Sequence, residues 1–188
     1  MRYDWAVRRF EYKEIQFDPN VLTYVIEGYY QSYKYFEIPS FCRMLSLTSQ
    51  IPVCISANDV AVHIRRTDYL NNNFHNVLGF DYYINSLTDL STKLKISKVY
   101  VFSDDLEWCK SNFPKTYHIE FVTMENDVEE FIYMSKFSNI IVANSTFSWW
   151  AAHISHAKYI YYPKEWFVKD CHLNTRDLCP KSWIQKDD

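Results

Sequence analysis

From residue 60 onward, the chain alternates short apolar runs with longer amphipathic ones. Five short runs have the character of β-strands, at residues 60–64, 98–102, 118–122, 139–143 and 158–162. Helical spacing of apolar residues occurs near residues 80–94, 105–112, 127–137 and 147–155. Regular alternation of strand and helix is typical of a parallel sheet with helices on its faces. The sequence therefore predicts an α/β, Rossmann-like domain over residues 58–188.

The two ends of the chain have a different character. Residues 1–57 are rich in Tyr, Phe and charged residues, and they predict a helix at 39–48 with at most one or two strands. We expect this N-terminal segment, mostly helical or irregular, to join the α/β domain in one compact unit. Residues 177–188 predict a polar tail. The continuous apolar character of residues 139–143 predicts a central strand that is buried on both faces.

The overall charge excludes some classes of partner. Lys and Arg number 20 against 23 Asp and Glu, which gives a net charge of −3. Such a chain has no general attraction for nucleic acid or anionic lipid, so an anionic ligand needs a local cluster of positive groups. The sequence shows no apolar run of about 18 residues and no signal-peptide pattern, and we therefore expect a cytoplasmic protein.

The cysteines and histidines predict no metal site. The five cysteines are an odd number and widely scattered, which favours reduced thiols over a disulfide framework. Cys171, His172 and Cys179 come nearest to a metal cluster, but they lack the close paired spacing of zinc ligands. His153 and His156 have helical i, i+3 spacing without a third local ligand.

Glycine is scarce, and this limits how the chain can bind phosphate. The only two glycines are Gly28 and Gly79, far apart in the sequence. The chain therefore contains neither a Walker loop nor a glycine-rich dinucleotide turn. Any phosphate must be held by side chains and helix ends.

The first candidate site begins on the run at 60–64 and continues beyond it: His63, Arg65, Arg66 and Asp68. Open α/β sheets bind ligands at the carboxyl ends of their strands, so we expect both guanidinium groups to reach that crevice. An arginine fork suits pyrophosphate oxygens, and its charge would stabilise a phosphate leaving group. The alternative is that both arginines pair with surface carboxylates. Asp68 is a candidate general base by position and chemistry, whereas a strand histidine such as His63 is more often a core residue.

The second candidate site lies where the run at 98–102 gives way to a helix, and consists of Ser103, Asp104 and Asp105. Asp104 and Glu107 have the spacing of a helix capping box, and carboxylates favour a helix N-terminus. An aspartate at this edge could also accept hydrogen bonds from the N–H groups of a purine. Spacing alone does not separate the two interpretations.

The third candidate site follows the run at 139–143: Asn144, Ser145, Thr146 and Phe147. With Ser145 or Thr146 as the N-cap, the first backbone N–H groups of the helix and the hydroxyls would face the crevice. This makes an anion site without glycine. We expect Trp149 and Trp150 to pack in the core, because Trp beside Ala-Ala in a helix packs well against a sheet.

Four groups of motifs occur in order along the chain. They are Gly-Tyr-Tyr-Gln-Ser at 28–32 with Tyr35-Phe36, His-Ile-Arg-Arg-Thr-Asp-Tyr at 63–69, His75 with Asp-Tyr-Tyr at 81–83 and Phe-Ser-Asp-Asp at 102–105, and Asn-Ser-Thr-Phe-Ser-Trp-Trp at 144–150. Together they resemble glycosyltransferase family 11, the α-1,2-fucosyltransferases, from about residue 27 to residue 166. Thr67 stands where that family usually has glycine, although the related α-1,6-fucosyltransferases also show threonine there.

The resemblance implies a GT-B-like fold of which this chain is the donor-binding half. It implies GDP-fucose as the donor, a galactose-terminated glycan as the acceptor, inversion at the anomeric carbon, and neither metal nor cofactor. Arg65 would be catalytic, and Asp68 joins it as the candidate base only by its position and chemistry. The implied donor contacts are Arg65 and Arg66 with the β-phosphate, Asp104 or Asp105 with guanine, and Ser145, Thr146 and Phe147 with phosphate and base.

One family motif has no counterpart here. Members of the family usually open with Gly-Gly-Leu-Gly-Asn-Gln, in an N-terminal half that helps to form the acceptor side. This chain would then be a fragment, a truncated reading frame, or a relative whose missing lobe comes from another chain, and self-association is one possibility. A non-catalytic GDP-sugar-binding module is an alternative, and an ordinary α/β protein with surface ion pairs is a third.

Overall fold

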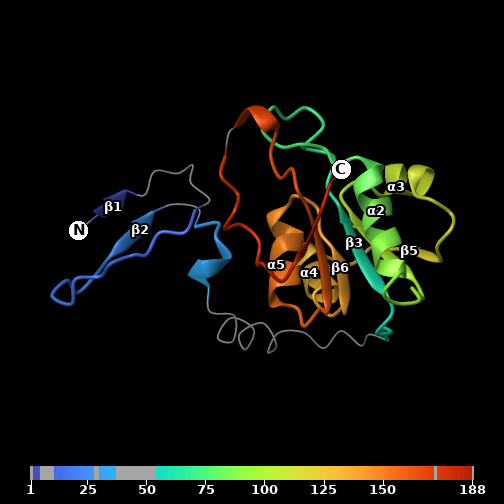
Figure 1. Cartoon of the computed structure of the whole chain (residues 1–188), viewed down its shortest axis with the longest axis horizontal. Coiled ribbons are helices and arrows are strands. Elements are labelled where there is room, and N and C mark those ends of the chain that lie inside the picture. The colour runs from blue at the N-terminus through green and yellow to red at the C-terminus, as the bar shows by residue number, and fades with distance from the viewer. Residues whose placement is uncertain (1, 5–10, 28–29, 37–53, 172, 188) are drawn as a thin grey trace.

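The computed structural model describes residues 2–4, 11–27, 30–36, 54–171 and 173–187 of the 188-residue chain. Its main feature is a six-stranded, all-parallel sheet in the order β5-β4-β3-β6-β7-β8 (Figure 1). The strands are β3 (Val60–Ile64), β4 (Val99–Ser103), β5 (Ile119–Phe121), β6 (Asn139–Ile141), β7 (Tyr159–Pro163) and β8 (Ile184–Lys186). The predicted α/β, Rossmann-like fold is confirmed.

The order of the strands fixes where a ligand can enter. The chain enters the sheet at β3, runs to one edge through β4 and β5, and then returns to β6 and proceeds to the other edge. β3 and β6 are therefore neighbours although 74 residues of chain separate Ile64 from Asn139, and Val62 pairs with Ile141. In doubly wound sheets, ligands bind outside the carboxyl ends of the strands at this reversal point.

Four described helices cover the sheet: α2 (Phe80–Ser91), α3 (Leu106–Asn112), α4 (Asp127–Met134) and α5 (Thr146–Ile154). The pair α2 and α3 lies on one face and the pair α4 and α5 on the other (Figure 1). Two 3₁₀ turns, η1 (Tyr33–Tyr35) and η2 (Lys169–Cys171), belong to the connecting segments. None of the described helices has the length and apolar character needed to cross a membrane.

Two hydrophobic cores fill the spaces between the sheet and its helices. Alternate residues of a strand point to opposite faces, so Val62 and Ile64 pack with α2 and α3, whereas Ala61 packs with α4 and α5. Ile140 and Ile141 of β6 are both fully buried, one in each core. The predicted central strand buried on both faces is confirmed. Each fully buried aliphatic side chain stabilises the fold by roughly 1.5–3 kcal/mol.

The predicted polar tail at 177–188 is wrong. β8 adds a parallel edge strand to β7, with Ile184 opposite Tyr161, and Trp183 is only 9% exposed. β8 is three residues long, and none of them is fully buried, so its sequence carries almost no apolar pattern. Its place in the fold comes from pairing with β7 and from the burial of the tryptophan that precedes it.

The N-terminal segment forms a separate small pair of strands. β1 (Arg2–Asp4) runs parallel to β2 (Val25–Glu27), and the pair lies away from the six-stranded sheet (Figure 1). Asp177 connects this segment to the rest of the chain, because it accepts from Lys34 Nζ at 2.5 Å and from the Tyr12 amide at 3.1 Å. The predicted helix at 39–48 lies outside the described residues, and the boundary at residue 57 stays a prediction.

Asp89, near the end of α2, fastens the C-terminal strands to that helix. Its carboxylate accepts hydrogen bonds from Lys93, from Tyr161 Oη at 2.7 Å and from Lys186 Nζ at 2.9 Å. These bonds, the one from Lys93 first, hold the pKa of the Asp89 carboxyl well below its usual range. A carboxylate with a lowered pKa stabilises the fold above the pKa of the unfolded chain, about 3.9, and this stabilisation is lost as the pH falls.

We expect Asp89→Asn to lower the free energy of unfolding at pH 7 by about 1 kcal/mol, since the side chain is partly exposed and its bonds are screened by solvent. The difference from the unmodified chain should shrink as the pH falls below about 4. Urea denaturation at several pH values measures both effects. Asp81→Asn, an exposed aspartate on the same helix, is the matched control. A loss that does not depend on pH would contradict this role.

Candidate active site

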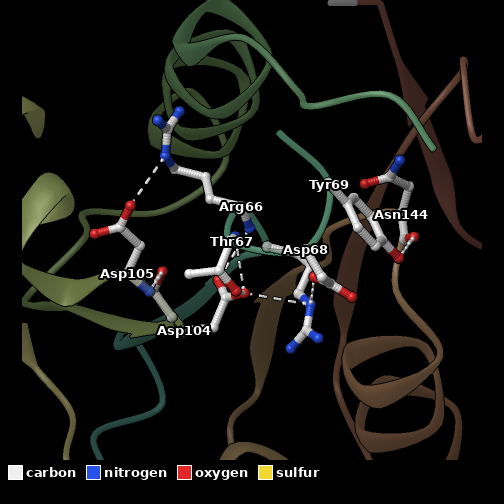
Figure 2. A network of polar contacts seen from close by, with 9 residues as sticks. Arg66, Thr67, Asp68, Tyr69, Asp104, Asp105 and Asn144 are labelled. Atoms are coloured by element: carbon white, nitrogen blue, oxygen red, sulfur yellow. Dashed lines mark hydrogen bonds and ion pairs between the residues drawn. The ribbon is translucent and has the colours of Figure 1, made fainter. Parts of the chain in front are cut away.

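The segments that follow β3, β4 and β6 meet at the carboxyl edge of the sheet, where the strand order reverses. Figure 2 shows Arg66, Thr67, Asp68 and Tyr69 after β3, together with Asp104, Asp105 and Asn144. All three candidate sites predicted from the sequence therefore lie at one edge. What each residue does there depends on its partners.

Asp104 holds the segment that leaves β3. Its Oδ1 accepts from the Arg66 amide at 2.9 Å, and its Oδ2 accepts from the Thr67 amide at 3.0 Å and from the Thr67 hydroxyl (Figure 2). Two oxygens thus satisfy two backbone N–H groups and one O–H group, which fixes the path of the chain. Thr67 contributes through its side chain, which a glycine at that position would lack.

The predicted helix cap at Asp104 is wrong, because the N-cap of α3 is Asp105. Asp105 Oδ1 accepts from the Trp108 amide at 3.2 Å, and the Asp105 amide donates to Ser103 Oγ at 3.0 Å. A capping box is recognised from residues that are close in sequence, so it reports only local hydrogen-bond partners. Asp104 instead finds partners 37 and 38 residues away on the neighbouring strand's exit, which local spacing does not reveal.

Arg65 and Asp68 form an ion pair at the site. Arg65 Nε lies 2.8 Å from Asp68 Oδ1 and 3.4 Å from Asp104 Oδ2, and the guanidinium lies 5.9 Å from the centroid of the Tyr69 ring. About a third of the Arg65 side chain is exposed. The hydrogen bond from Arg65 lowers the pKa of the Asp68 carboxyl, which makes Asp68 a weaker proton acceptor while the pair is intact.

Arg66 points to the other face of the sheet. Its Nε lies 3.3 Å from Asp105 Oδ2 (Figure 2). Its guanidinium carbon lies 3.6 Å from the centroid of the Trp108 ring. The structure does not bring the two guanidinium groups together. Side chains of consecutive residues in a strand point to opposite faces of the sheet. The sequence alone therefore predicts that Arg65 and Arg66, which directly follow β3, point to different faces.

His63 connects β3 to the start of α5. The side chain is 4% exposed, and its ring lies 5.2 Å from that of Phe147. Burial lowers the pKa of His63 to about 3, so the imidazole is neutral at pH 7. Its Nδ1 has no hydrogen-bond partner among the described residues. His63 is therefore a buried, neutral residue in contact with Phe147, and its predicted contact with the donor stays a prediction.

The N-terminus of α5 lies at this edge and has no side-chain cap. Ser145 is the N-cap, but its side chain makes no capping hydrogen bond, and Thr146 at the first helical position is exposed. The first N–H groups of a helix have no partner within the helix, and the helix dipole adds positive potential there. This arrangement is suited to an anion. Trp149 is buried, as expected, and Trp150 is half-buried against the core.

Hydrogen bonds of Asn144 and Tyr69 connect the segments that form the site. Asn144 is 1% exposed, and its Nδ2 donates to the carbonyls of Asn76 at 2.8 Å and Trp166 at 3.0 Å. Tyr69 Oη donates to the Asn144 carbonyl at 3.1 Å, across the reversal point (Figure 2). Sequence reasoning gave Tyr69 no role. His75, which stacks on Tyr69 at 4.5 Å, was matched to a motif but also assigned no role.

No three His, Cys, Asp or Glu side chains in the described part of the chain are placed to hold a metal ion. His172, one of the three residues considered from the sequence, lies outside the described residues.

Comparison with known proteins identifies the family. The model of the family "Glycosyl transferase family 11" matches residues 1–186. This chain belongs to glycosyl transferase family 11. The family match extends on both sides of residues 27–166, the range that the motifs indicated.

Three curated relatives of this family 11 chain are 32–34% identical to it over the aligned residues. The "O-antigen biosynthesis glycosyltransferase WbnK" of Escherichia coli is 32% identical over 157 residues, 79% of this chain and 51% of the relative. An "Alpha-1,2-colitosyltransferase" of Escherichia coli is 34% identical over 138 residues, 68% and 47% respectively. A "Galactoside 2-alpha-L-fucosyltransferase" of Caenorhabditis elegans is 32% identical over 152 residues, 70% and 42%. The chain spans about half the length of these relatives.

We expect Asp104→Asn to loosen the site of this family 11 chain without unfolding the sheet, because one charged acceptor for two backbone amides is lost. The amide protons of Arg66 and Thr67 should exchange with solvent at least about tenfold faster, equivalent to about 1.4 kcal/mol. Hydrogen exchange followed by NMR measures this. Asp105→Asn is the matched control and should expose the Trp108 amide instead. Equal exchange in both variants would show that Asp104 does not hold the segment.

Proposed function

We propose that this chain is the donor-binding part of an inverting, α-1,2-fucosyltransferase-like enzyme that takes GDP-fucose and a galactose-terminated glycan. The observation that carries the proposal is the N-terminus of α5, which has no side-chain cap and lies at the reversal point. The contact between His63 and Phe147 places this helix end beside the segment that leaves β3. That segment contains the partly exposed Arg65. Two curated relatives are named as fucosyl- and colitosyltransferases, which supports the proposed donor class.

Arg65 and the α5 N-terminus together supply the positive field that a pyrophosphate needs. In this proposal, donor binding moves Arg65 Nε from Asp68 and Asp104 to phosphate oxygens. This exchange keeps the guanidinium paired throughout, so no buried charge is left alone. In the reaction, the same guanidinium would stabilise the charge that develops on the β-phosphate as the glycosidic bond breaks.

The same exchange would prepare Asp68 as a base. When Arg65 turns to the phosphate, Asp68 loses the hydrogen bond that lowers its pKa, and its affinity for a proton rises. Asp68 is 54% exposed, so an acceptor hydroxyl can approach it. Deprotonation by Asp68 would then occur only in the presence of the donor. The transfer of the proton to Asp68 accompanies attack by the hydroxyl oxygen on the anomeric carbon.

For the guanine base, we propose Asp105 and Phe147 rather than Asp104. Asp104 accepts three hydrogen bonds within the chain, whereas Asp105 accepts two, from the Trp108 amide and Arg66 Nε, and is more exposed, 26% against 17%. Phe147, half-buried at the start of α5, contacts the rings of His63 and Phe131, and we propose that it packs on the base. Arg66, which stacks on Trp108, would hold Asp105 in place and reach the β-phosphate only by leaving that stack.

The proposal is tested by calorimetric titration with GDP and GDP-fucose after treatment with EDTA. We expect both to bind without added divalent metal, because Arg65 and the helix N-terminus compensate the phosphate charge. UDP-galactose is the matched control and should bind much more weakly. A strict requirement for magnesium or manganese, or equal affinity for UDP-galactose, would contradict the site.

We expect Arg65→Lys to lose as much GDP affinity as Arg65→Ala, on the order of 2 kcal/mol. A single ammonium group cannot reproduce the two parallel hydrogen bonds that a guanidinium makes to phosphate oxygens. Titration of both variants with GDP measures the loss, and Arg176→Lys, an arginine that is 67% exposed in side chain, is the control. GDP affinity in Arg65→Lys equal to that of the unmodified chain would show that Arg65 does not bind phosphate.

A further inference from the structure

A cavity lies at the C-terminal end of α5, the end away from the site described above. α5 has nine residues, and at 1.5 Å per residue its two ends are about 13 Å apart. The cavity has a volume of about 430 Å³, within the range of roughly 300–1,000 Å³ that small-molecule sites occupy. Residues with rings or polar groups that line it are Tyr33, Phe36, His153, Lys158, Ser182 and Trp183.

The walls of this cavity come from distant parts of the chain. Tyr33 and Phe36 belong to the N-terminal segment, and the Phe36 ring lies 4.5 Å from that of Trp150 on α5. Trp183 comes from the segment just before β8 and is 9% exposed, so its position is fixed by the core. Ligand sites are frequent where separate parts of a protein meet, and aromatic side chains commonly line them.

The polar groups of the cavity restrict the charge of a ligand. Lys158 and Ser182 are exposed, and the described lining residues include no Asp or Glu. His153 is 6% exposed, and its Nε2 has no hydrogen-bond partner among the described residues. Burial lowers the pKa of His153 to about 4, so it adds no charge at pH 7. The single lysine therefore favours a neutral or anionic ligand over a cationic one.

We propose that this cavity binds a pyranose ring of a carbohydrate, with a preference for a sugar that carries a carboxylate. Aromatic side chains in the lining suit the apolar face of a pyranose, and the exposed polar residues of the lining suit its hydroxyl groups. Lys158 would pair with the carboxylate. In a glycosyltransferase, such a site would hold a sugar of the glycan away from the reacting hydroxyl, and only this last assignment rests on the proposed function.

NMR titration of the isotope-labelled chain tests the proposal, with methyl β-D-glucopyranoside and methyl β-D-glucuronide as probes. We expect saturable shifts at the Trp183 indole and the Lys158 amide, with the glucuronide binding more tightly. Phe36→Ala should weaken both sugars about fivefold or more. Lys158→Ala should weaken the glucuronide alone. Val128→Ala and Lys110→Ala, exposed residues elsewhere, are the matched controls.

Absence of saturable shifts at Trp183 and Lys158 would overturn the proposal. Sugar affinities of the Phe36 and Lys158 variants equal to those of the control variants would overturn it as well. GDP affinity, measured on the same samples, should be unchanged in all four variants, which shows that each is folded. Failure of the unmodified chain to bind GDP would contradict the proposed function and leave the sugar site standing.

Discussion

The site depends on one carboxylate. Asp104, which follows β4, accepts hydrogen bonds from the backbone amides of Arg66 and Thr67 and thereby determines how the chain leaves β3. The positions of Arg65, Asp68 and Tyr69 follow from that path, and Tyr69 in turn connects it to β6 through the Asn144 carbonyl. Three strands are thus coupled at the point where the sheet order reverses, which is where an open α/β sheet receives a ligand.

Each arginine of the site has its own acidic partner on its own face of the sheet. Arg65 pairs with Asp68, and Arg66 pairs with Asp105 and stacks on Trp108. This division gives the two arginines different capacities. Arg65 is the more exposed and can exchange a carboxylate for a phosphate, whereas Arg66 is embedded in aromatic packing and stabilises the start of α3. The proposed function therefore assigns phosphate binding to Arg65, whereas Arg66 is held by Asp105 and Trp108.

Much of the fold could be predicted from the sequence, because periodicity reports burial directly. The runs at 60–64 and 139–143 are apolar since both faces of those strands are covered. β8 was missed because a three-residue edge strand needs little apolar surface. The meeting of the three candidate segments at one edge was predictable from strand ends, but the partners of Asp104 were not, since they lie 37 and 38 residues away. The separation of Arg65 from Arg66 was predictable from strand alternation.

The central claim is that a nucleoside diphosphate binds at the reversal point between β3 and β6. Backbone NMR of the isotope-labelled chain, recorded with and without GDP, tests it most directly because it locates the ligand residue by residue. The account predicts that the largest amide shifts fall at residues 63–68 and 145–147, on both sides of that point. Shifts confined to α2 and α3, or to the cavity at the far end of α5, would contradict it.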